Sequence, residues 1–400
     1  MDPSGIEDWF ELALDLPEKR RERMLTDLAR KDPATAEAVR SLLQGMIKNP
    51  DFACQTGRGG WSAKWAPPGP PLHVAIIGAG LAGLTCARQL RGHGLKVSLF
   101  DKGRGPGGRM STRRTADGDA FDHGAQYFTA RDPNFADEVA AWVAAGAAAE
   151  WHGRIAELEA GRSTAVPTTP RFVGVPRMSA ILRHLSGEEV QFGRRVAQIE
   201  RTGRRFTLTF TDAEPIDGID AVVVAAPAPQ TEQLLQPVAP DLAARAAQAE
   251  LAPCWAVMLT FATRLPIKFD GAFVADSPLA WIARNNSKPG RDATECWVLH
   301  GSPEWSQDRF DATPAAVIQE LSAALAEATG EVLPAATTAT AHRWAYAQAV
   351  GVLNEPYLFD DDLRIGACGD WCVAPRVEGA YQSGAALAAR LLVRTRRAGR

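Results

Sequence analysis

The sequence of 400 residues predicts an α/β fold, and three observations lead to this class. A short apolar run at 74–77 leads directly into the glycine turn GAGLAG and then into a helical pattern. A second strand–glycine–helix pattern begins at residue 363, near the end of the sequence. Between these two units, several short runs have the alternating or apolar character of strands. We therefore expect one parallel sheet with its helices, and a second region of strands and helices.

The composition is that of an ordinary globular chain, with 46% hydrophobic and 23% charged residues. The length is enough for two domains or for one domain with a large insertion. A formal net charge of -3 argues against general nucleic-acid binding. No apolar run reaches membrane-spanning length, and the N-terminus is unlike a secretory signal. The cysteines are scattered and form no pair of CxxC motifs, so we expect reduced thiols, a cytoplasmic location and no metal site.

Residues 1–50 have the pattern of a small helical unit ahead of the main body. Apolar residues recur at helical spacing from Ile6 to Leu14, and Asp32-Pro33 restarts a helical pattern further on. Residues 51–71 are rich in glycine and proline and predict a linker. We expect residues 1–50 to be a helical appendage that packs on the main domain. The alternative is a module that docks a protein partner.

The glycine turn has the full context of a dinucleotide-binding fingerprint, with a strand, a helix, a second strand and an acid in the right order. Gly78 allows the tight turn, Gly80 lets the backbone approach a diphosphate, and Gly83 lets helix and strand pack closely. The free N–H groups that open the helix favour an anion. Asp101 follows the second strand, at 96–100, where its carboxylate is placed to hydrogen-bond a ribose diol. A glycine turn without a ligand is the structural alternative.

The middle of the chain predicts further elements. Helical patterns cover 134–149, 179–185 and 315–328. Ser179 is expected to cap the helix at 179–185. Strand patterns cover 190–200, 205–210, 219–225, 255–261, 279–284 and 295–299. The last three of these strands are expected to form a separate antiparallel sheet. The segment FDHGAQYF at 121–128 suggests a turn that passes a ligand, and a β-turn with a satisfied His123 is the alternative.

The second glycine unit lies close to the C-terminus. The strand at 363–367 runs into Gly369 and Asp370, and a helix then opens around Glu378 and is expected to continue to Val393. A single cofactor that spans both glycine units explains why the pattern occurs twice. The basic tail from residue 394 is expected to be a solvated chain end.

The triplet Gly107-Gly108-Arg109 resembles the second glycine motif of flavoprotein oxidases and hydroxylases, where it adds a contact to the FAD diphosphate. Domains that bind only NAD generally lack it, so the resemblance favours FAD. The triplet is part of a longer resemblance: residues 72–393 are similar to the renalase group within the amine-oxidase and hydroxylase flavoprotein superfamily. The stretches that carry the similarity are GAGLAG, DKGRGPGGRMSTRR, FDHGAQYF, FVGVPRMSAI, HRWAYAQA and CGDWCVAPRVEGAYQSG.

The resemblance implies a Rossmann-type FAD-binding domain and a β-sheet-plus-helices substrate domain of the amine-oxidase/p-hydroxybenzoate-hydroxylase-like type. The FAD-binding domain would be discontinuous, at 72–130, 190–228 and 360–400, and the substrate domain would occupy 131–189 and 229–359. Backbone near Val196 would meet the adenine, and the opening of the last helix would aim N–H groups at the flavin. The expected residues for noncovalent FAD are Gly78, Gly80, Leu81, Ala82, Gly83, Asp101, Lys102, Gly108, Arg109, Val196, Gly369, Asp370, Glu378, Gly379 and Ala380.

The resemblance also implies an activity. Members of the renalase group oxidise misreduced isomers of NADH and NADPH and pass the electrons to O2, which gives H2O2. Such a dihydropyridine substrate needs a flat aromatic slot rather than acid–base groups, with anion-tolerant groups at its mouth. We expect Trp344 and Tyr381 to act as the catalytic residues that meet the substrate. Further candidates for the slot are Trp255, Trp281 and Trp297, and candidates for phosphate contacts are Arg113, Arg171, Arg177 and Arg284.

Two other functions remain open at this point. A flavin amine oxidase that acts on a small or aromatic amine is the first, although Lys268 and Lys288 lie in no matching motif for a flavin-site lysine. The second is a non-catalytic flavin-binding protein that uses its N-terminal helices to engage a partner.

Overall fold

The structure is a computed structural model, and it describes residues 18–37, 39–40, 72–115, 118–159, 162–187 and 190–398. Contacts within the chain divide it into two compact units, one made of Met1–Pro68 with Asp132–Glu138 and the other of Gly69–Arg131 with Val139–Arg400. The predicted linker at 51–71 and the helical pattern from Ile6 to Leu14 lie outside the described residues.

In the first unit, helix α2 (Glu18–Lys31) is followed by a new helical turn that starts at Pro33. Asp32 caps this turn, because its carboxylate accepts hydrogen bonds from the backbone N–H and the hydroxyl of Thr35, at 3.0 and 2.6 Å. These bonds lower the pKa of Asp32. The predicted restart at Asp32 is therefore confirmed. Leu25 and Leu28 of α2 are buried, so one face of this helix is packed.

The second unit contains a sheet of six strands in the order β19-β20-β13-β1-β2-β9. Its neighbouring strands are parallel except for the edge pair β19 and β20. The strands are β1 (His73–Ile77), β2 (Lys96–Asp101), β9 (Val190–Phe192), β13 (Ala221–Val224), β19 (Leu358–Asp360) and β20 (Ile365–Ala367). The predicted apolar run became the central strand β1, which explains why it lacks polar residues on either face.

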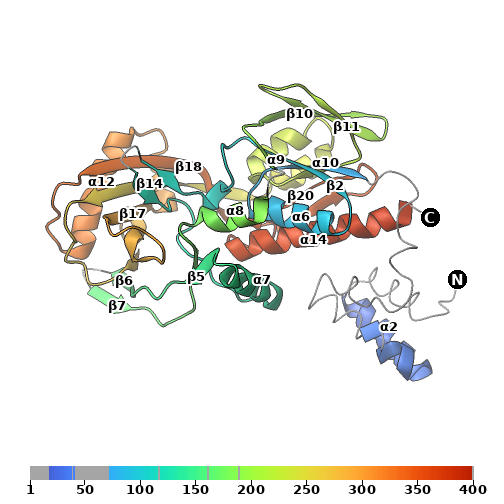
Figure 1. Cartoon of the computed structure of the whole chain (residues 1–400), viewed down its shortest axis with the longest axis horizontal. Coiled ribbons are helices and arrows are strands. Elements are labelled where there is room, and N and C mark those ends of the chain that lie inside the picture. The colour runs from blue at the N-terminus through green and yellow to red at the C-terminus, as the bar shows by residue number, and fades with distance from the viewer. Residues whose placement is uncertain are drawn as a thin grey trace. The chain divides into compact units, whose positions relative to one another are not determined.

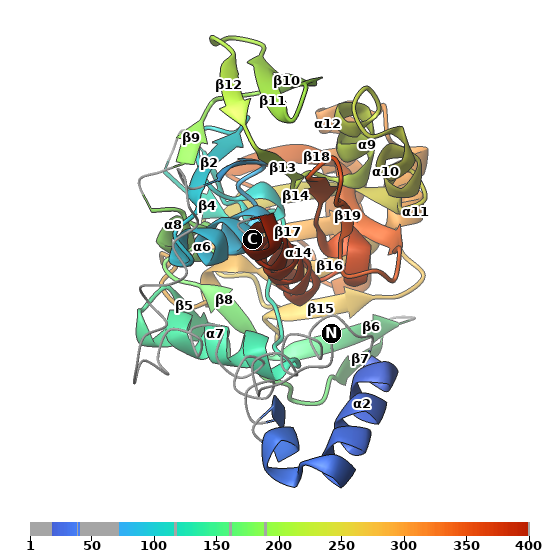
Figure 2. The ribbon, with the colours of Figure 1, turned by 90° about the vertical axis from the view of Figure 1, so that its right-hand side faces the viewer.

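Two helices lie side by side along this sheet, α6 (Leu81–Gly92) and α14 (Val377–Ala398) (Figures 1 and 2). A Cβ atom at Gly384 of α14 would overlap the carbonyl oxygen of Ala82 on α6. The glycine therefore allows two helices from opposite ends of the sequence to touch backbone to backbone. α14 also extends beyond Val393, so the tail expected to be a solvated end continues as helix to Ala398.

The seven-stranded sheet of the same unit has the order β18-β14-β17-β16-β15-β6-β7. The predicted antiparallel arrangement holds for β14, β16 and β17, whereas β6 runs parallel to β15. Helix α12 (Pro314–Thr329) covers one face, where Trp255, Leu299 and Leu321 share a buried cluster (Figure 1). The strands are β6 (Ile155–Glu159), β7 (Arg162–Ala165), β14 (Glu250–Phe261), β15 (Gly271–Val274), β16 (Leu279–Arg284), β17 (Glu295–Gly301) and β18 (Thr338–Gly351).

A third sheet and short elements connect these layers. The third sheet is antiparallel, with β10 (Val196–Thr202), β11 (Arg205–Phe210) and β12 (Ile216–Ile219). The remaining helices are α7 (Pro133–Ala144), α8 (Ser179–Ser186), α9 (Ala228–Leu235), α10 (Pro240–Ala246), α11 (Pro303–Asp308), α13 (Asp370–Val373), η1 (Gly108–Met110) and η2 (Asn285–Ser287). The remaining strands are β3 (Arg113–Arg114), β4 (Ala120–Phe121), β5 (Ala148–Glu150) and β8 (Phe172–Gly174).

Three local predictions were wrong, and glycine accounts for two of them. The helix predicted at 134–149 ends at Ala144, because Gly146 has a positive φ of 70° and the chain then enters β5. The strand predicted at 190–200 is divided into β9 and β10 by Gly193, which also has φ of 70°. Ser179 is not a cap but the first residue of α8, since Met178 occupies the cap position without a side-chain hydrogen bond.

Candidate functional site

The glycine turn lies where the order of the parallel strands changes direction. The chain leaves β1 through α6 to reach β2 on one side, whereas β13 pairs with β1 on the other side. A ligand site is expected in the crevice at such a point, beyond the carboxyl ends of the strands. Gly78 has φ of 111°, and a Cβ atom there would lie 2.5 Å from the carbonyl oxygen of Ala225, just after β13.

The glycines of the turn serve different needs. A Cβ atom at Gly83 would overlap the carbonyl oxygen of Gly78, so packing of α6 on β1 is enough to require both residues. Gly80 is different, because a Cβ atom there would meet nothing within 4 Å. Gly80 is also the N-cap of α6, so no side chain at the cap accepts a hydrogen bond from the first N–H groups of the helix, at Leu81 and Ala82. This arrangement fits a diphosphate.

The second glycine motif lies against the first. Gly108 has φ of 47°, and a Cβ atom there would lie 3.5 Å from the Cα of Gly80. Arg109 forms a two-pronged ion pair with Asp370, from Nη1 to Oδ2 at 2.9 Å and from Nη2 to Oδ1 at 2.5 Å. The Arg109–Asp370 pair joins the predicted cofactor segments from both ends of the sequence, as one spanning cofactor requires.

The carboxylate of Asp101 organises the loop below these glycines. Its Oδ2 accepts a hydrogen bond from the N–H of Ala79 at 2.7 Å, and its Oδ1 accepts one from Gly103 at 2.6 Å. The backbone carbonyl of Asp101 accepts a bond from Arg194, two residues before Val196 at the start of β10. The structure thus brings the predicted adenosine contacts, Asp101 and Val196, into one region, while Lys102 donates to Gln230 at 3.0 Å.

The C-terminal glycine unit is equally constrained. The N–H of Gly369 donates to the Ser383 hydroxyl at 3.0 Å, and a Cβ atom at Gly379 would overlap the carbonyl oxygen of Ala374. The Glu378 carboxylate accepts a bond from the N–H of Arg131 at 2.6 Å. The N–H of Ala380 already donates to the Arg376 carbonyl, which weighs against the flavin contact predicted for Ala380.

Trp344 belongs to a cluster of rings. Its ring centre lies 4.9 Å from that of His123 and 4.6 Å from that of His342. Trp344 Nε1 and His300 Nε2 both donate to the carbonyl oxygen of His123, at 2.9 and 3.1 Å. We call His123, His300, His342 and Trp344 the ring cluster. The ring cluster is connected to the predicted cofactor region through β18, which carries both Trp344 and Ala347. Arg109 Nη1 donates a hydrogen bond to the carbonyl of Ala347 at 3.4 Å.

The histidines of the ring cluster are held neutral near pH 7. Burial lowers the pKa of His123 to about 3 and that of His300 to about 4. Burial also lowers the pKa of His342. In the described ranges, no group of three or more His, Cys, Asp or Glu side chains is arranged to hold a metal ion.

The loop that carries His123 is fixed by a buried ionic network. Asp122 is 1% exposed, pairs with Arg291, and lies 3.5 Å from Lys288 Nζ. Lys288 also donates to Gln126 Oε1 at 3.0 Å. Burial lowers the pKa of Lys288 to about 8, against the opposing effect of Asp122. The network holds the segment around His123 in one place.

Several other residues predicted for the pocket do not line the same face as the ring cluster or are buried. Trp255 and Trp297 lie in the core under α12, so they are not part of a slot. Arg284 is also buried and pairs with Glu295 at 3.2 Å, which argues against a phosphate contact. Tyr381 is 8% exposed on α14 and as it stands offers a substrate little surface.

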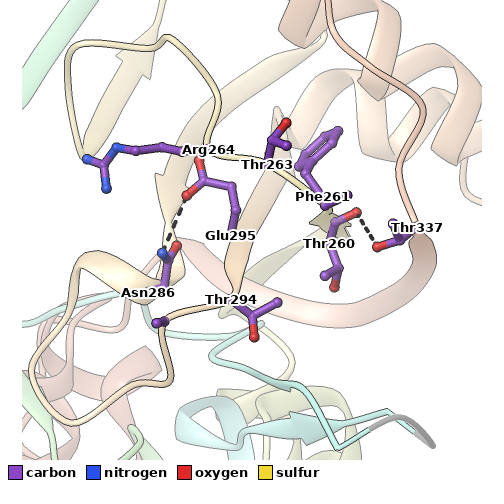
Figure 3. Close-up of a pocket in the computed structure, with 10 residues that line it drawn as sticks. Thr260, Phe261, Thr263, Arg264, Asn286, Thr294, Glu295 and Thr337 are labelled. Atoms are coloured by element: carbon purple, nitrogen blue, oxygen red, sulfur yellow. Dashed lines mark hydrogen bonds between the residues drawn. The ribbon is translucent and has the colours of Figure 1, made fainter.

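A cavity of about 460 Å³ lies elsewhere, at the end of β14 (Figure 3). Two hydrogen bonds connect residues that line it. Asn286 Nδ2 donates to Glu295 Oε2 at 3.4 Å, and the Thr337 hydroxyl donates to the Thr260 carbonyl at 3.1 Å. None of the residues predicted to meet cofactor or substrate lines this cavity. It is therefore not the site to which the motifs point.

Sequence reasoning singled out Trp344 and His123 but missed His300 and His342. Both histidines lie opposite Ala256, one on each neighbouring strand. His300 lies one residue beyond the strand predicted at 295–299, and no strand was predicted around His342. The signal that could have brought the two together is the pairing register of β14, β17 and β18. That register is not written in any one segment.

Family models match two parts of the chain. An NAD(P)-binding Rossmann-like domain matches residues 76–142, and the flavin containing amine oxidoreductase family matches residues 147–392. Among the described residues, no helix combines the length and apolar character that a bilayer crossing requires.

Curated relatives match over short segments. A hydroxyneurosporene desaturase of Rubrivivax gelatinosus is 42% identical over 88 residues, which are 21% of this chain and 15% of that protein. An L-amino-acid oxidase of Daboia russelii is 46% identical over 44 residues, which are 11% of this chain and 9% of that protein. The match thus spans a small part of the length of these relatives.

Among solved structures, a putrescine oxidase bound to putrescine is similar in fold, with a TM-score of 0.60 and 15% identity. The similarity covers 81% of this chain and 100% of that one. At this identity the likeness concerns the fold, which is an α/β fold with a Rossmann-like domain and a mixed-sheet amine-oxidase domain.

Proposed function

The chain belongs to the flavin-containing amine oxidoreductase family, and on this premise we propose that it is a renalase-like oxidase with noncovalent FAD. Its substrate in this proposal is a dihydropyridine, a misreduced isomer of NADH or NADPH. When bound, FAD supplies the two-electron acceptor that takes a hydride at N5 and passes the electrons to O2 as H2O2. The protein's part is to bind the cofactor and the substrate and to orient the substrate ring, and the proton that completes H2O2 comes from solvent.

The residues that would hold FAD lie in the two joined glycine units. The open space over Gly80 and the facing Gly108 would take the diphosphate, with the Arg109–Asp370 pair beside it. Asp101 and the backbone at Val196 would take the adenosine end. The opening of α14, around Gly379, would meet the flavin ring.

The observation that carries the substrate proposal is the neutrality of the ring cluster. A dihydropyridine gives up a hydride without losing a proton, whereas an ammonium substrate must first be deprotonated. An imidazole with a pKa of about 3, such as His123, is a poor proton acceptor near pH 7. The cluster therefore offers a wall of neutral rings in place of a base, with Trp344 and His342 only half-buried.

The cysteines nearest the C-terminal glycine unit support noncovalent attachment. Cys368 and Cys372 are fully buried, and burial raises the pKa of Cys372 to about 12. A thiol rather than a thiolate is the weaker nucleophile, so neither residue is prepared for a bond to the cofactor. Acid precipitation of the holoenzyme should leave the flavin in the supernatant. A yellow pellet would contradict this part of the proposal.

A flavin amine oxidase is the second candidate function. The rings of Trp344 and His342 meet at 82°, an edge-to-face arrangement that could also form a wall of an amine cage. The family match supports this candidate as well.

Anaerobic mixing separates the two candidates. The holoenzyme is mixed with 2-dihydro and 6-dihydro isomers of NAD(P), with ordinary NADH, and with a set of amines, and the flavin absorbance is followed. Bleaching by the isomers alone is the expected result. Bleaching by amines alone would overturn the renalase-like proposal and establish the second candidate.

A further inference from the structure

One row of side chains crosses the seven-stranded sheet on the face away from α12. Cross-strand pairing links His342 on β18 to Ala256 on β14, and Ala256 to His300 on β17. The row continues from His300 to Trp281 on β16, and from Trp281 to Phe273 on β15. Directly opposite residues share a face, so these five side chains lie on one surface.

The loop of His123 lies along the same row. Its carbonyl accepts the bonds from Trp344 and His300 at one end, and at the other end the ring of Tyr127 lies 5.4 Å from that of Trp281. The wall that begins at the ring cluster therefore continues to Trp281 and Tyr127.

Two buried donors next to Tyr127 lack acceptors in the part of the chain that the structure describes. Trp281 is 7% exposed and its Nε1 has no hydrogen-bond partner. Arg171 is 8% exposed and its Nε also has none. The Arg171 guanidinium lies 5.3 Å from the centre of the Tyr127 ring and donates from Nη1 to the Thr169 carbonyl at 3.3 Å. Buried polar groups of this kind are ordinarily paired.

Other buried arginines show what Arg171 lacks. The side chains of Arg284 and Arg291 are 1% and 4% exposed, and they pair with Glu295 and Asp122 respectively. Among the described residues, Arg171 forms no ion pair. A buried charge without a counter-ion is costly, and a nearby aromatic ring compensates only part of that cost. An anion from outside the chain would supply the missing partner.

We propose that Arg171 and Trp281, with Tyr127 between them, form a subsite for an acidic oxygen group of the substrate. This inference rests on the proposed function, because it takes the ring cluster as the place of the reactive ring. His342 and Trp281 are three strand spacings apart, roughly 14 Å along the row. The substrate is therefore an elongated molecule with a flat ring at one end and a phosphate or carboxylate roughly 10–14 Å away. A small diamine does not satisfy this description.

The test is calorimetric binding to the oxidised holoenzyme with two matched pairs of probes. Nicotinamide mononucleotide is compared with nicotinamide riboside, which differs from it only in lacking the phosphate, and 8-phenyloctanoate is compared with its amide. Wild type should bind each probe that carries the acidic group about tenfold or more tightly than its counterpart without that group, as charge-assisted hydrogen bonds allow. A preference in the first pair alone identifies phosphate, and one in the second pair alone identifies carboxylate.

Arg171→Met should reduce the preference to about one, and Trp281→Phe, which removes only the N–H donor, should reduce it partly. Arg183→Met, at an exposed arginine of α8, is the matched control and should leave it unchanged. An unchanged flavin spectrum and thermal midpoint identify folded variants, and Trp281→Phe decides the case if Arg171→Met does not fold.

The outcomes separate this inference from the proposed function. Equal binding by wild type of probes with and without the acidic group overturns the subsite even if dihydropyridine isomers bleach the flavin. A preference that survives both substitutions also overturns it. A preference that disappears in Arg171→Met supports the subsite even if only amines bleach it.

Discussion

The glycines of the first turn have two different roles. Packing requires Gly78 and Gly83, whereas Gly80 has room beside it for a ligand. Gly83 faces the Gly78 carbonyl, whereas the space over Gly80 is open. Gly83→Ala should therefore destabilise the protein by about 1–3 kcal/mol through overpacking. Gly80→Ala should leave the apoprotein midpoint unchanged and weaken flavin retention. Thermal unfolding of the apoprotein and flavin content after gel filtration measure the two effects. Normal flavin retention in Gly80→Ala would mean that the open space is not the diphosphate site.

At the same scale, the buried histidines predict how stability depends on pH. The pKa of His300 in the fold is about 4, below its ordinary value of 6.5. Between pH 4 and pH 6.5 the unfolded chain therefore binds more protons than the folded chain. Its contribution to the unfolding free energy is complete above pH 6.5 and falls as the pH drops toward 4, by at most about 1.4 kcal/mol per pH unit.

His300→Gln should reduce that slope. Urea titrations at several values between pH 4.5 and 7.5 measure it, and the exposed His152, replaced in the same way, is the control. Equal slopes in wild type and His300→Gln would show that this imidazole does not stay neutral in the fold.

At the scale of elements, the Arg109–Asp370 pair connects the two glycine units. Arg109→Ala or Asp370→Ala should each weaken flavin binding by about 2 kcal/mol, the usual loss for a hydrogen bond to a charged group. The double variant should lose less than the sum, because the two residues share one interaction. Flavin dissociation constants from fluorescence titration measure these changes.

The control is Arg154→Ala, which breaks another two-pronged pair, with Asp270, at an arginine that is 60% exposed. Flavin affinity should not change in this variant. Strict additivity of the first two substitutions would mean that Arg109 and Asp370 meet the cofactor independently.

Elements also determine what could be predicted from the sequence. The turn at Gly78 and the neighbouring strands were predictable because each depends on a few consecutive residues. The ring cluster was only half predictable, since His300 and His342 become neighbours through strand register. Arg171 appeared among several arginines in the sequence, and burial without an ionic partner, visible only after folding, separates it from Arg284.

At the scale of the whole molecule, all residues assigned to the site belong to the unit made of Gly69–Arg131 and Val139–Arg400. Removal of residues 1–68 should therefore leave flavin content and the rate of anaerobic flavin reduction unchanged. Stopped-flow absorbance measures the rate, and full-length protein from the same preparation is the reference. A loss of reduction with normal flavin content would assign residues 1–68 a part in the reaction.

The strand order of the six-stranded sheet has a consequence for biosynthesis. β1 completes its pairing only with β13, and β13 in turn pairs with β20, about 290 residues after β1 leaves the ribosome. At 5–20 residues per second this takes roughly 15–60 s. During that time, strands that are apolar on both faces have unpaired edges, which favour aggregation. The nascent chain is thus a natural client for chaperones until its last helix has been made.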